Sequence, residues 1–157
     1  MTKFIFLIAF GVIVGDVFPQ IQISSLKGNW ELEKIKLDQY EIDAHTLKLN
    51  PKVENKLKGN SDSVLISNLV LGVIKNKIGR YYAFNEKNVL VITDIKKHQE
   101  ILTSYKFVAP NLIITENSVQ EFYKIELLNA TQMVLVDKNG LIDLPMKLYF
   151  IKKTISP

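Results

Sequence analysis

The stretch Leu26-Lys27-Gly28-Asn29-Trp30-Glu31-Leu32 decides the fold of this chain. It holds the only tryptophan among 157 residues, placed two residues after a glycine. From Trp30 onward apolar and charged residues alternate, which is the pattern of a strand with one buried face. We therefore place the first strand of a domain here, from about Asn29 to Leu37.

The apolar residues of this first strand change face along its length. Trp30 and Leu32 share one face, whereas Ile35 and Leu37 share the other, because successive side chains of a strand point to opposite sides. A change of face needs a β-bulge or a strong twist, which we expect near Glu33. Such strands are typical of curved barrel walls.

The residues before this stretch have the composition of a secretory signal. Lys3 supplies a positive charge, and an apolar run of eleven residues follows from Phe4 to Val14. Eleven helical residues rise about 16 Å, short of the ~30 Å hydrocarbon core of a bilayer. We predict a signal peptide over residues 1–20 and a secreted or periplasmic mature protein without stable membrane insertion. A retained membrane anchor is the alternative.

Composition indicates one globular domain. A chain of 157 residues is long enough to bury a core, and 47% apolar residues are too many for a disordered chain. A net charge of +4 is too small to indicate a nucleic-acid partner. The chain has no cysteine, so neither disulfides nor a lipid-modified cysteine can contribute. This usage is typical of a secreted or periplasmic bacterial protein that is stabilised by its core alone.

One segment interrupts the β pattern. Ser61 and Asp62 offer a helix N-cap, and Leu65, Leu69 and Val73 follow at helical spacing. Several β-branched residues favour two buried strands instead. The pattern favours a helix over 62–77 but leaves both structures open.

The chain after Gly79 alternates with period two and is divided by short turns. The expected strands cover about Arg80–Phe84, Val89–Thr93, Ile101–Val108, Leu112–Thr115, Val119–Leu127, Met133–Val136 and Met146–Lys152. With the first strand and a short one at Thr46–Leu49, the count is eight or nine. Closing such a meander removes both of its edges. We predict a mainly β fold: one antiparallel up-and-down barrel of about eight strands with one helical insertion, forming a single domain over 24–154.

The strand at Val119–Leu127 has one unusual residue. Val119, Tyr123, Ile125 and Leu127 form an apolar face, and Glu121 is the only charged residue on it. The other face carries polar and charged residues, as expected of a wall strand.

The opening stretch and the strands behind it resemble the Gly-x-Trp start of lipocalins and of the secreted bacterial lipocalin-like domains, over about Leu26–Lys153. In that family the glycine permits a sharp turn into the first strand and the tryptophan plugs one barrel end, so the resemblance assigns Gly28 and Trp30 to barrel-end structure. A late arginine that packs over the tryptophan in many lipocalins is missing, which leaves Lys152 or Lys153 to replace it. The Thr-Asp-Tyr signature and the disulfides are also missing. The resemblance implies a barrel fold and the binding of an apolar ligand.

The sequence offers little for catalysis. His45 and His98 are the only histidines, they are not spaced as a metal-binding pair, and no cysteine could join them. There is no Gly-x-Ser-x-Gly elbow and no phosphate-binding loop. We predict a protein that is not an enzyme, with no cofactor and no metal site.

Aromatic residues on several strands are the candidate ligand contacts. The inward faces of an eight-stranded barrel either fill with side chains or leave room for one small ligand. The predicted ligand-binding residues are Tyr82, Phe84, Tyr105, Phe107, Tyr123 and Phe150. The same residues are equally expected in a packed core.

Basic residues gather in one region. Seven of them lie between residues 48 and 80, against Glu54 and Asp62. They are Lys48, Lys52, Lys56, Lys58, Lys75, Lys77 and Arg80. Over a barrel mouth they would attract anionic ligands or lipid headgroups, whereas a solvated loop is the simpler alternative.

Two functional hypotheses follow. The first is a non-enzymatic, secreted or periplasmic lipocalin-like protein that binds a small apolar or amphipathic ligand in its barrel. The alternative is a packed barrel that acts as a protein-interaction module, either an inhibitor or an envelope scaffold, whose protein partner the sequence does not identify.

Overall fold

The computed structural model describes residues 22–37, 40–46, 51, 54–55, 64–138 and 145–154. The predicted signal peptide, residues 1–20, lies outside these residues. Among the described helices, none combines the length and the apolar character needed to span a bilayer.

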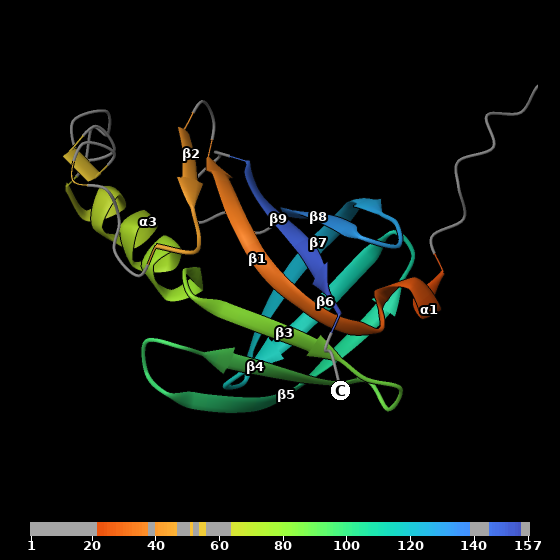
Figure 1. The fold of residues 1–157 in the computed structure, drawn as a ribbon. Helices are drawn as coiled ribbons and strands as arrows, with labels where there is room; N and C mark the ends of the chain where they lie inside the picture. Colours follow the sequence, from red (N-terminus) through yellow and green to blue (C-terminus); the bar gives the residue numbers. More distant parts are fainter. Residues whose placement is uncertain are drawn as a thin grey trace, which may run out of the picture.

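Eight antiparallel strands close a barrel (Figure 1). They are β1 (Gly28–Leu37), β3 (Arg80–Phe84), β4 (Val89–Asp94), β5 (Gln99–Val108), β6 (Asn111–Glu116), β7 (Val119–Leu128), β8 (Gln132–Asp137) and β9 (Met146–Lys153). From β3 onward each strand pairs with the next in the chain, and β1 pairs with both β3 and β9, which closes the wall. The predicted mainly β, antiparallel barrel of about eight strands is confirmed.

Along one edge of β1, the two halves of the strand pair with different neighbouring strands. The first half pairs with β3 and the second half with β2 (Tyr40–Asp43), while β9 pairs along the whole strand. The register against β9 shifts between Leu32 and Lys34. This irregularity confirms the bulge expected near Glu33: it allows Leu32 and Ile35, three positions apart, both to be buried in the core.

The second strand lies earlier than the sequence predicts. β2 covers Tyr40–Asp43, and Thr46 lies in the bend that follows it, while 47–49 lie outside the described residues. The Asp43 side chain accepts a hydrogen bond from the His45 amide at 2.8 Å, and the Thr46 hydroxyl donates to the Asp43 carbonyl at 2.9 Å. Such local side-chain contacts favour a turn over a continued strand.

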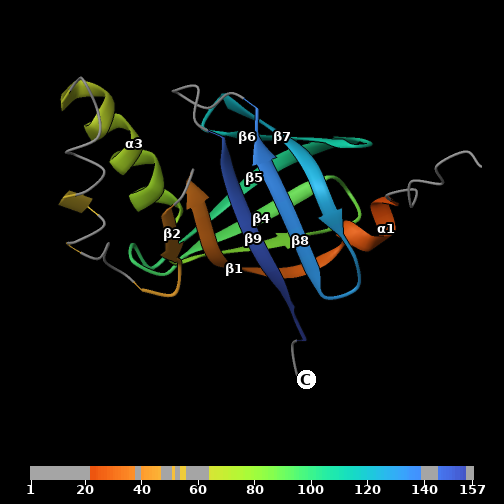
Figure 2. The same ribbon diagram turned by 90° about the horizontal axis from the view of Figure 1, so that it is seen from above.

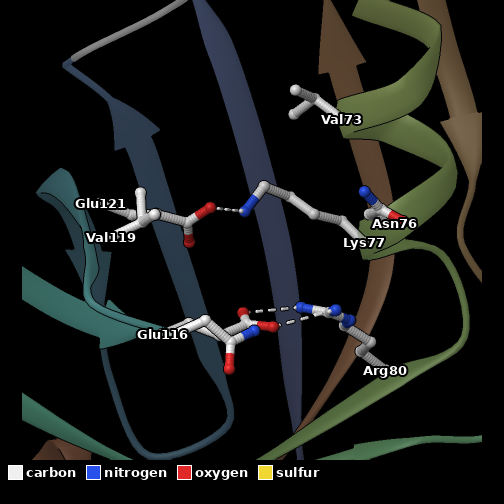
Figure 3. A pocket seen from close by; sticks show the side chains of 8 residues that line it. Val73, Asn76, Lys77, Arg80, Glu116, Val119 and Glu121 are labelled. Atoms are coloured by element: carbon white, nitrogen blue, oxygen red, sulfur yellow. Dashed lines mark hydrogen bonds and ion pairs between the residues drawn. The ribbon is translucent and has the colours of Figure 1, made fainter.

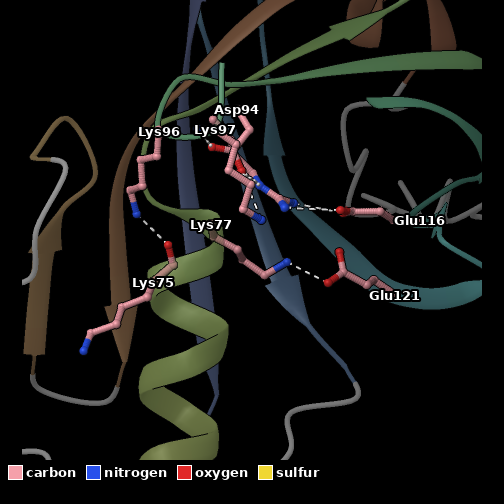
Figure 4. Close-up of polar contacts among 8 residues, drawn as sticks. Lys75, Lys77, Asp94, Lys96, Lys97, Glu116 and Glu121 are labelled. Atoms are coloured by element: carbon pink, nitrogen blue, oxygen red, sulfur yellow. Dashed lines mark hydrogen bonds and ion pairs between the residues drawn. The ribbon is translucent and has the colours of Figure 1, made fainter. Parts of the chain in front are cut away.

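The insertion between β2 and β3 contains a helix, α3 (Val64–Lys77), rather than two strands. Its last two turns bury Leu71 and Ile74 against the core. At its C-terminus the Lys96 ammonium donates to the Lys75 carbonyl at 2.6 Å (Figure 4), which satisfies one of the carbonyls that a helix end leaves unpaired. A short helix, α1 (Ile23–Leu26), lies at the opposite end of the barrel from α3 (Figure 2).

The inward faces of the strands form one continuous apolar core. In β7, as in β1, a bulge interrupts the alternation of buried and exposed residues. Pairing with β8 shifts between Ile125 and Leu127, so Leu127 is 40% exposed and Leu128 packs against the core instead. The apolar face that the sequence forms from Val119, Tyr123, Ile125 and Leu127 is therefore interrupted before Leu127, because a second bulge reverses the alternation there.

Candidate functional site

The barrel end next to α1 is closed by Trp30. We call this the Trp30 end. The indole is fully buried, and its Nε1 donates a hydrogen bond to the Leu26 carbonyl at 2.7 Å. Lys152 pairs with Trp30 across β1 and β9, and its Nζ lies 5.1 Å from the indole ring centroid. Of the two lysines considered as replacements for the late arginine, Lys152 is thus the one over the tryptophan, whereas Lys153 forms an ion pair with Glu31.

Gly28 is required by the geometry of the same end. Its backbone φ is +121°, a conformation that residues with a side chain rarely adopt. A Cβ placed there would also lie 2.7 Å from Cε of Lys152. The glycine therefore provides both the sharp turn into β1 and the space in which Lys152 reaches the indole.

The six predicted ligand-binding aromatics point into the barrel and pack as part of its core. Tyr82 and Phe150 meet edge to face with ring centroids 5.2 Å apart, and Phe84 and Tyr105 do the same at 5.0 Å. The Tyr105 hydroxyl donates to the backbone carbonyl of residue 85 at 2.7 Å. The buried members of the set are Tyr82, Phe84, Tyr105, Tyr123 and Phe150, and Phe107 is partly buried against them. Their contacts are those of core residues, and ligand binding by the whole set stays a prediction.

The opposite end of the barrel, which we call the α3 end, buries charged groups. Lys77, on the last turn of α3, is 3% exposed. Its Nζ donates to Glu121 Oε1 at 2.8 Å and to the Tyr123 hydroxyl at 2.8 Å, and that hydroxyl donates to Glu121 Oε2 at 2.7 Å. Lysine, phenol and carboxylate therefore form a closed ring of three hydrogen bonds, part of which is drawn in Figure 3.

The protonation states of this ring follow from its surroundings. Burial, followed by the charge of Glu121, raises the pKa of Tyr123 well above its usual value. Burial alone would raise the pKa of Glu121, but the charge and hydrogen bond of Lys77, with the hydrogen bond from Tyr123, outweigh it and lower that pKa. At neutral pH the phenol is thus a proton donor and the carboxylate is ionised.

A second buried ion pair lies beside the first. Arg80 NH1 donates to Glu116 Oε2 at 2.9 Å, and NH2 donates to Oε1 at 3.2 Å, a two-pronged contact between planar groups. Arg80 Nε lies 3.6 Å from Oδ2 of Asp94, which is itself buried and also 3.6 Å from the Lys97 ammonium. Burial would lower the pKa of Arg80, but Tyr82 and Glu116 outweigh it and raise that pKa. The guanidinium therefore stays charged.

A pocket of about 190 Å³ opens between α3 and the β6–β7 hairpin at this end. It is lined by Val73, Asn76, Lys77, Arg80, Glu116, Asn117, Val119 and Glu121. The Lys77–Glu121 pair joins α3 to β7, and the Arg80–Glu116 pair joins β3 to β6 (Figure 3). Val73 on α3 and Val119 on β7 line the same pocket. The pocket thus combines apolar side chains at its sides with buried, hydrogen-bonded charges.

The predicted basic region is divided by the structure. Lys77 and Arg80 are buried in the pocket, whereas Lys75 forms an ion pair with Glu54 at 2.9 Å. Lys48, Lys52, Lys56 and Lys58 lie outside the described residues.

A second hollow, of about 370 Å³, lies along the β1–β2 hairpin. Its lining residues are Glu33, Lys34, Glu41, Ile42, Asp43 and His45. Beside it, His45 Nδ1 is 3.2 Å from Glu31 Oε1, which also accepts a 2.9 Å hydrogen bond from the Tyr81 hydroxyl. The other histidine, His98, lies in the β4–β5 turn. Within the described part of the chain, no three His, Cys, Asp or Glu side chains are grouped as metal ligands would be.

The sequence did not identify Glu116 or Glu121 as site residues, and it placed Lys77 and Arg80 only within a basic region. One signal for Glu121 was present, because it is the only charged residue on the otherwise apolar face of its strand. A charge at such a position needs a buried partner, but the sequence does not say which lysine supplies it.

No protein-family model, curated protein or solved structure matches this chain. The chain is therefore assigned to no family, and its functional interpretation depends on its own geometry.

Proposed function

We propose that this is a non-enzymatic, secreted or periplasmic lipocalin-like protein that binds a small amphipathic molecule at the α3 end of its barrel. The observation that supports the proposal is the pocket between α3 and β7. It offers a polar group the buried charge of Lys77 and the partly exposed charge of Glu121, and it offers an apolar group the side chains of Val73 and Val119. Small-molecule sites commonly combine a few convergent polar groups with an apolar lining.

The size of the pocket limits what it can enclose. A volume of about 190 Å³ is below the ~300–1,000 Å³ of most ligand sites. We therefore infer that the headgroup enters the pocket while an apolar chain follows the side formed by Val73 and Val119. Val119 is 63% exposed, so covering it would contribute hydrophobic free energy at ~25 cal/mol per Å².

Titration with a fluorescent amphiphile, 1-anilinonaphthalene-8-sulfonate, tests this proposal. We expect saturable binding of one molecule per protein, weakened at least tenfold by Val119→Asp or Val73→Asp, because a charge at either position opposes contact with the apolar part. Leu102→Asp, on the outer wall, is the control and should bind like the wild type. Absence of saturable binding, or equal weakening by all three substitutions, would contradict the proposal.

The alternative is a packed barrel that acts as a protein-interaction module, such as an inhibitor or an envelope scaffold. It is favoured by exposed apolar side chains: Leu102 on β5 is 75% exposed opposite Val91 on β4, and Leu69 on α3 is 47% exposed. Co-purification of one stoichiometric protein, lost on Leu102→Asp or Leu69→Asp but not on Val119→Asp, would support this alternative over the first proposal.

A further inference from the structure

The pair formed by Lys77 and Glu121 is unequal in its access to solvent. The Lys77 side chain is 4% exposed, whereas the Glu121 side chain is 33% exposed and borders the pocket. The lysine is fixed by the last turn of α3 and by its hydrogen bond to Tyr123. The carboxylate is thus the member of the pair that can turn toward solvent, while the ammonium stays buried.

Lys77 and Tyr123 together form a seat for one carboxylate. Each gives a hydrogen bond to a different oxygen of Glu121, at 2.8 Å from the ammonium and 2.7 Å from the phenol. The Lys77–Tyr123 hydrogen bond occupies a lone pair of the phenol oxygen, so the phenol hydrogen is directed toward the acid. This seat presents two donors, so a carboxylate can accept one bond on each oxygen and pair with the ammonium charge, whereas a neutral hydroxyl offers one oxygen and forms no ion pair.

Loss of the anion from this seat is strongly unfavourable in free energy. If Glu121 turned away alone, a buried ammonium would lose its only directly bonded carboxylate among the described contacts. Uncompensated buried charges are strongly unfavourable. Glu121 can leave readily only when another anion takes its position.

Resting on the proposed function, we propose that Glu121 is an internal occupant of an anion seat made by Lys77 and Tyr123. The carboxylate of an anionic amphiphile then binds by replacing it. The exchange conserves the hydrogen bonds of the seat, so net affinity comes from the apolar chain lying along Val73 and Val119. Glu121, once displaced, is hydrated at the pocket opening. This exchange favours amphiphiles with a carboxylate headgroup over neutral amphiphiles. It also keeps the affinity low for small carboxylates that have no apolar chain.

The test compares two probes of equal chain length, decanoate and decanol, by isothermal titration at pH 7. Glu121→Gln removes the internal competitor and keeps its shape. We expect it to raise the affinity for decanoate about tenfold or more, since hydrogen bonds to charged groups are of that strength, and to leave decanol unchanged. Glu126→Gln is the matched control: it removes an equal charge from an outer-wall acid that pairs with Lys147, and both affinities should stay as in the wild type.

A second variant keeps the test decisive if Glu121→Gln folds poorly. Tyr123→Phe removes one donor of the seat, and we expect it to lower the decanoate affinity several-fold relative to decanol. If both probes bind and neither substitution changes their ratio, the internal-occupant proposal is wrong while the binding function stands. If neither probe binds the wild type or the variants, the proposed function itself fails.

Discussion

At the Trp30 end the buried group is an indole with a single hydrogen bond to α1, whereas at the α3 end the buried groups are Lys77 and Arg80 with their acids. Both ends exclude water from the same apolar core. The first does so with apolar area, which contributes directly to stability. The second buries ion pairs, which apolar residues of similar size often replace without loss of stability. Stability alone therefore explains the Trp30 end, but it gives no reason for the charges at the α3 end.

The largest effect should follow removal of the apolar plug. Trp30→Ala is expected to lower the free energy of unfolding by about 3–5 kcal/mol, as for large buried aromatics. Trp30→Phe is the control and should cost less, since it keeps a ring but loses the hydrogen bond to Leu26. Urea unfolding of both variants is followed by circular dichroism, because the substitutions remove the only tryptophan and tryptophan fluorescence is then absent. A loss below about 1 kcal/mol for Trp30→Ala would show that it is no plug.

Breaking the ion pair at the other end should cost less than losing the plug. Lys77→Met leaves the Glu121 carboxylate without its cation, and we expect a loss of about 2 kcal/mol, below the usual range for buried pairs because Glu121 can rehydrate. The double variant Lys77→Met/Glu121→Gln should recover most of this loss. Urea unfolding of the double-mutant cycle gives the coupling energy, and strictly additive losses would contradict the assigned pair.

Backbone strain gives a third and smaller contrast. Gly28→Ala should destabilise the protein by about 1–2 kcal/mol, because of its positive φ and the approach of Lys152. Gly72, which lies in α3 and where an added Cβ would meet no other group within 4 Å, is the matched control. Gly72→Ala should stabilise by about 0.5–1 kcal/mol through helix propensity. Thermal unfolding measures both variants. If the two substitutions shifted the midpoint temperature of unfolding in the same direction, this contrast would be refuted.

The smallest expected effect is a pH dependence confined to the α3 end. The pKa of Glu121 is lower in the folded protein than its ordinary value of 4.5, so its stabilisation is fully present above that value. It is lost as pH falls through the lower folded pKa. The stability of Glu121→Gln should therefore fall less between pH 6 and pH 3 than that of the wild type. Equal slopes in urea unfolding across this range would show that Glu121 contributes no such linkage.

The strand order and the bulge could be predicted because they depend on local alternation. A change of buried face within β1 requires a bulge, whatever the partner strands are. The second bulge, before Leu127, could not be predicted in this way, since the sequence of β7 shows no change of pattern at that point. The charged pocket could not be predicted, because Lys77 meets Glu121 only after α3 is placed at the barrel end, and Arg80 on β3 meets Glu116 on β6 only after the sheet has curved into a barrel. The number of residues between two side chains in the sequence does not say how close they lie in the folded barrel.

The pairing of β1 with β9 has a consequence for folding. Trp30 lies opposite Lys152, so the wall cannot close until nearly the whole described chain is available. Before that moment β1 and β8 each present an unpaired strand edge, and such edges recruit other chains. Contacts this distant in sequence also slow folding. We therefore expect refolding yield to fall with protein concentration, and a chain shortened before β9 to aggregate rather than to form a smaller barrel.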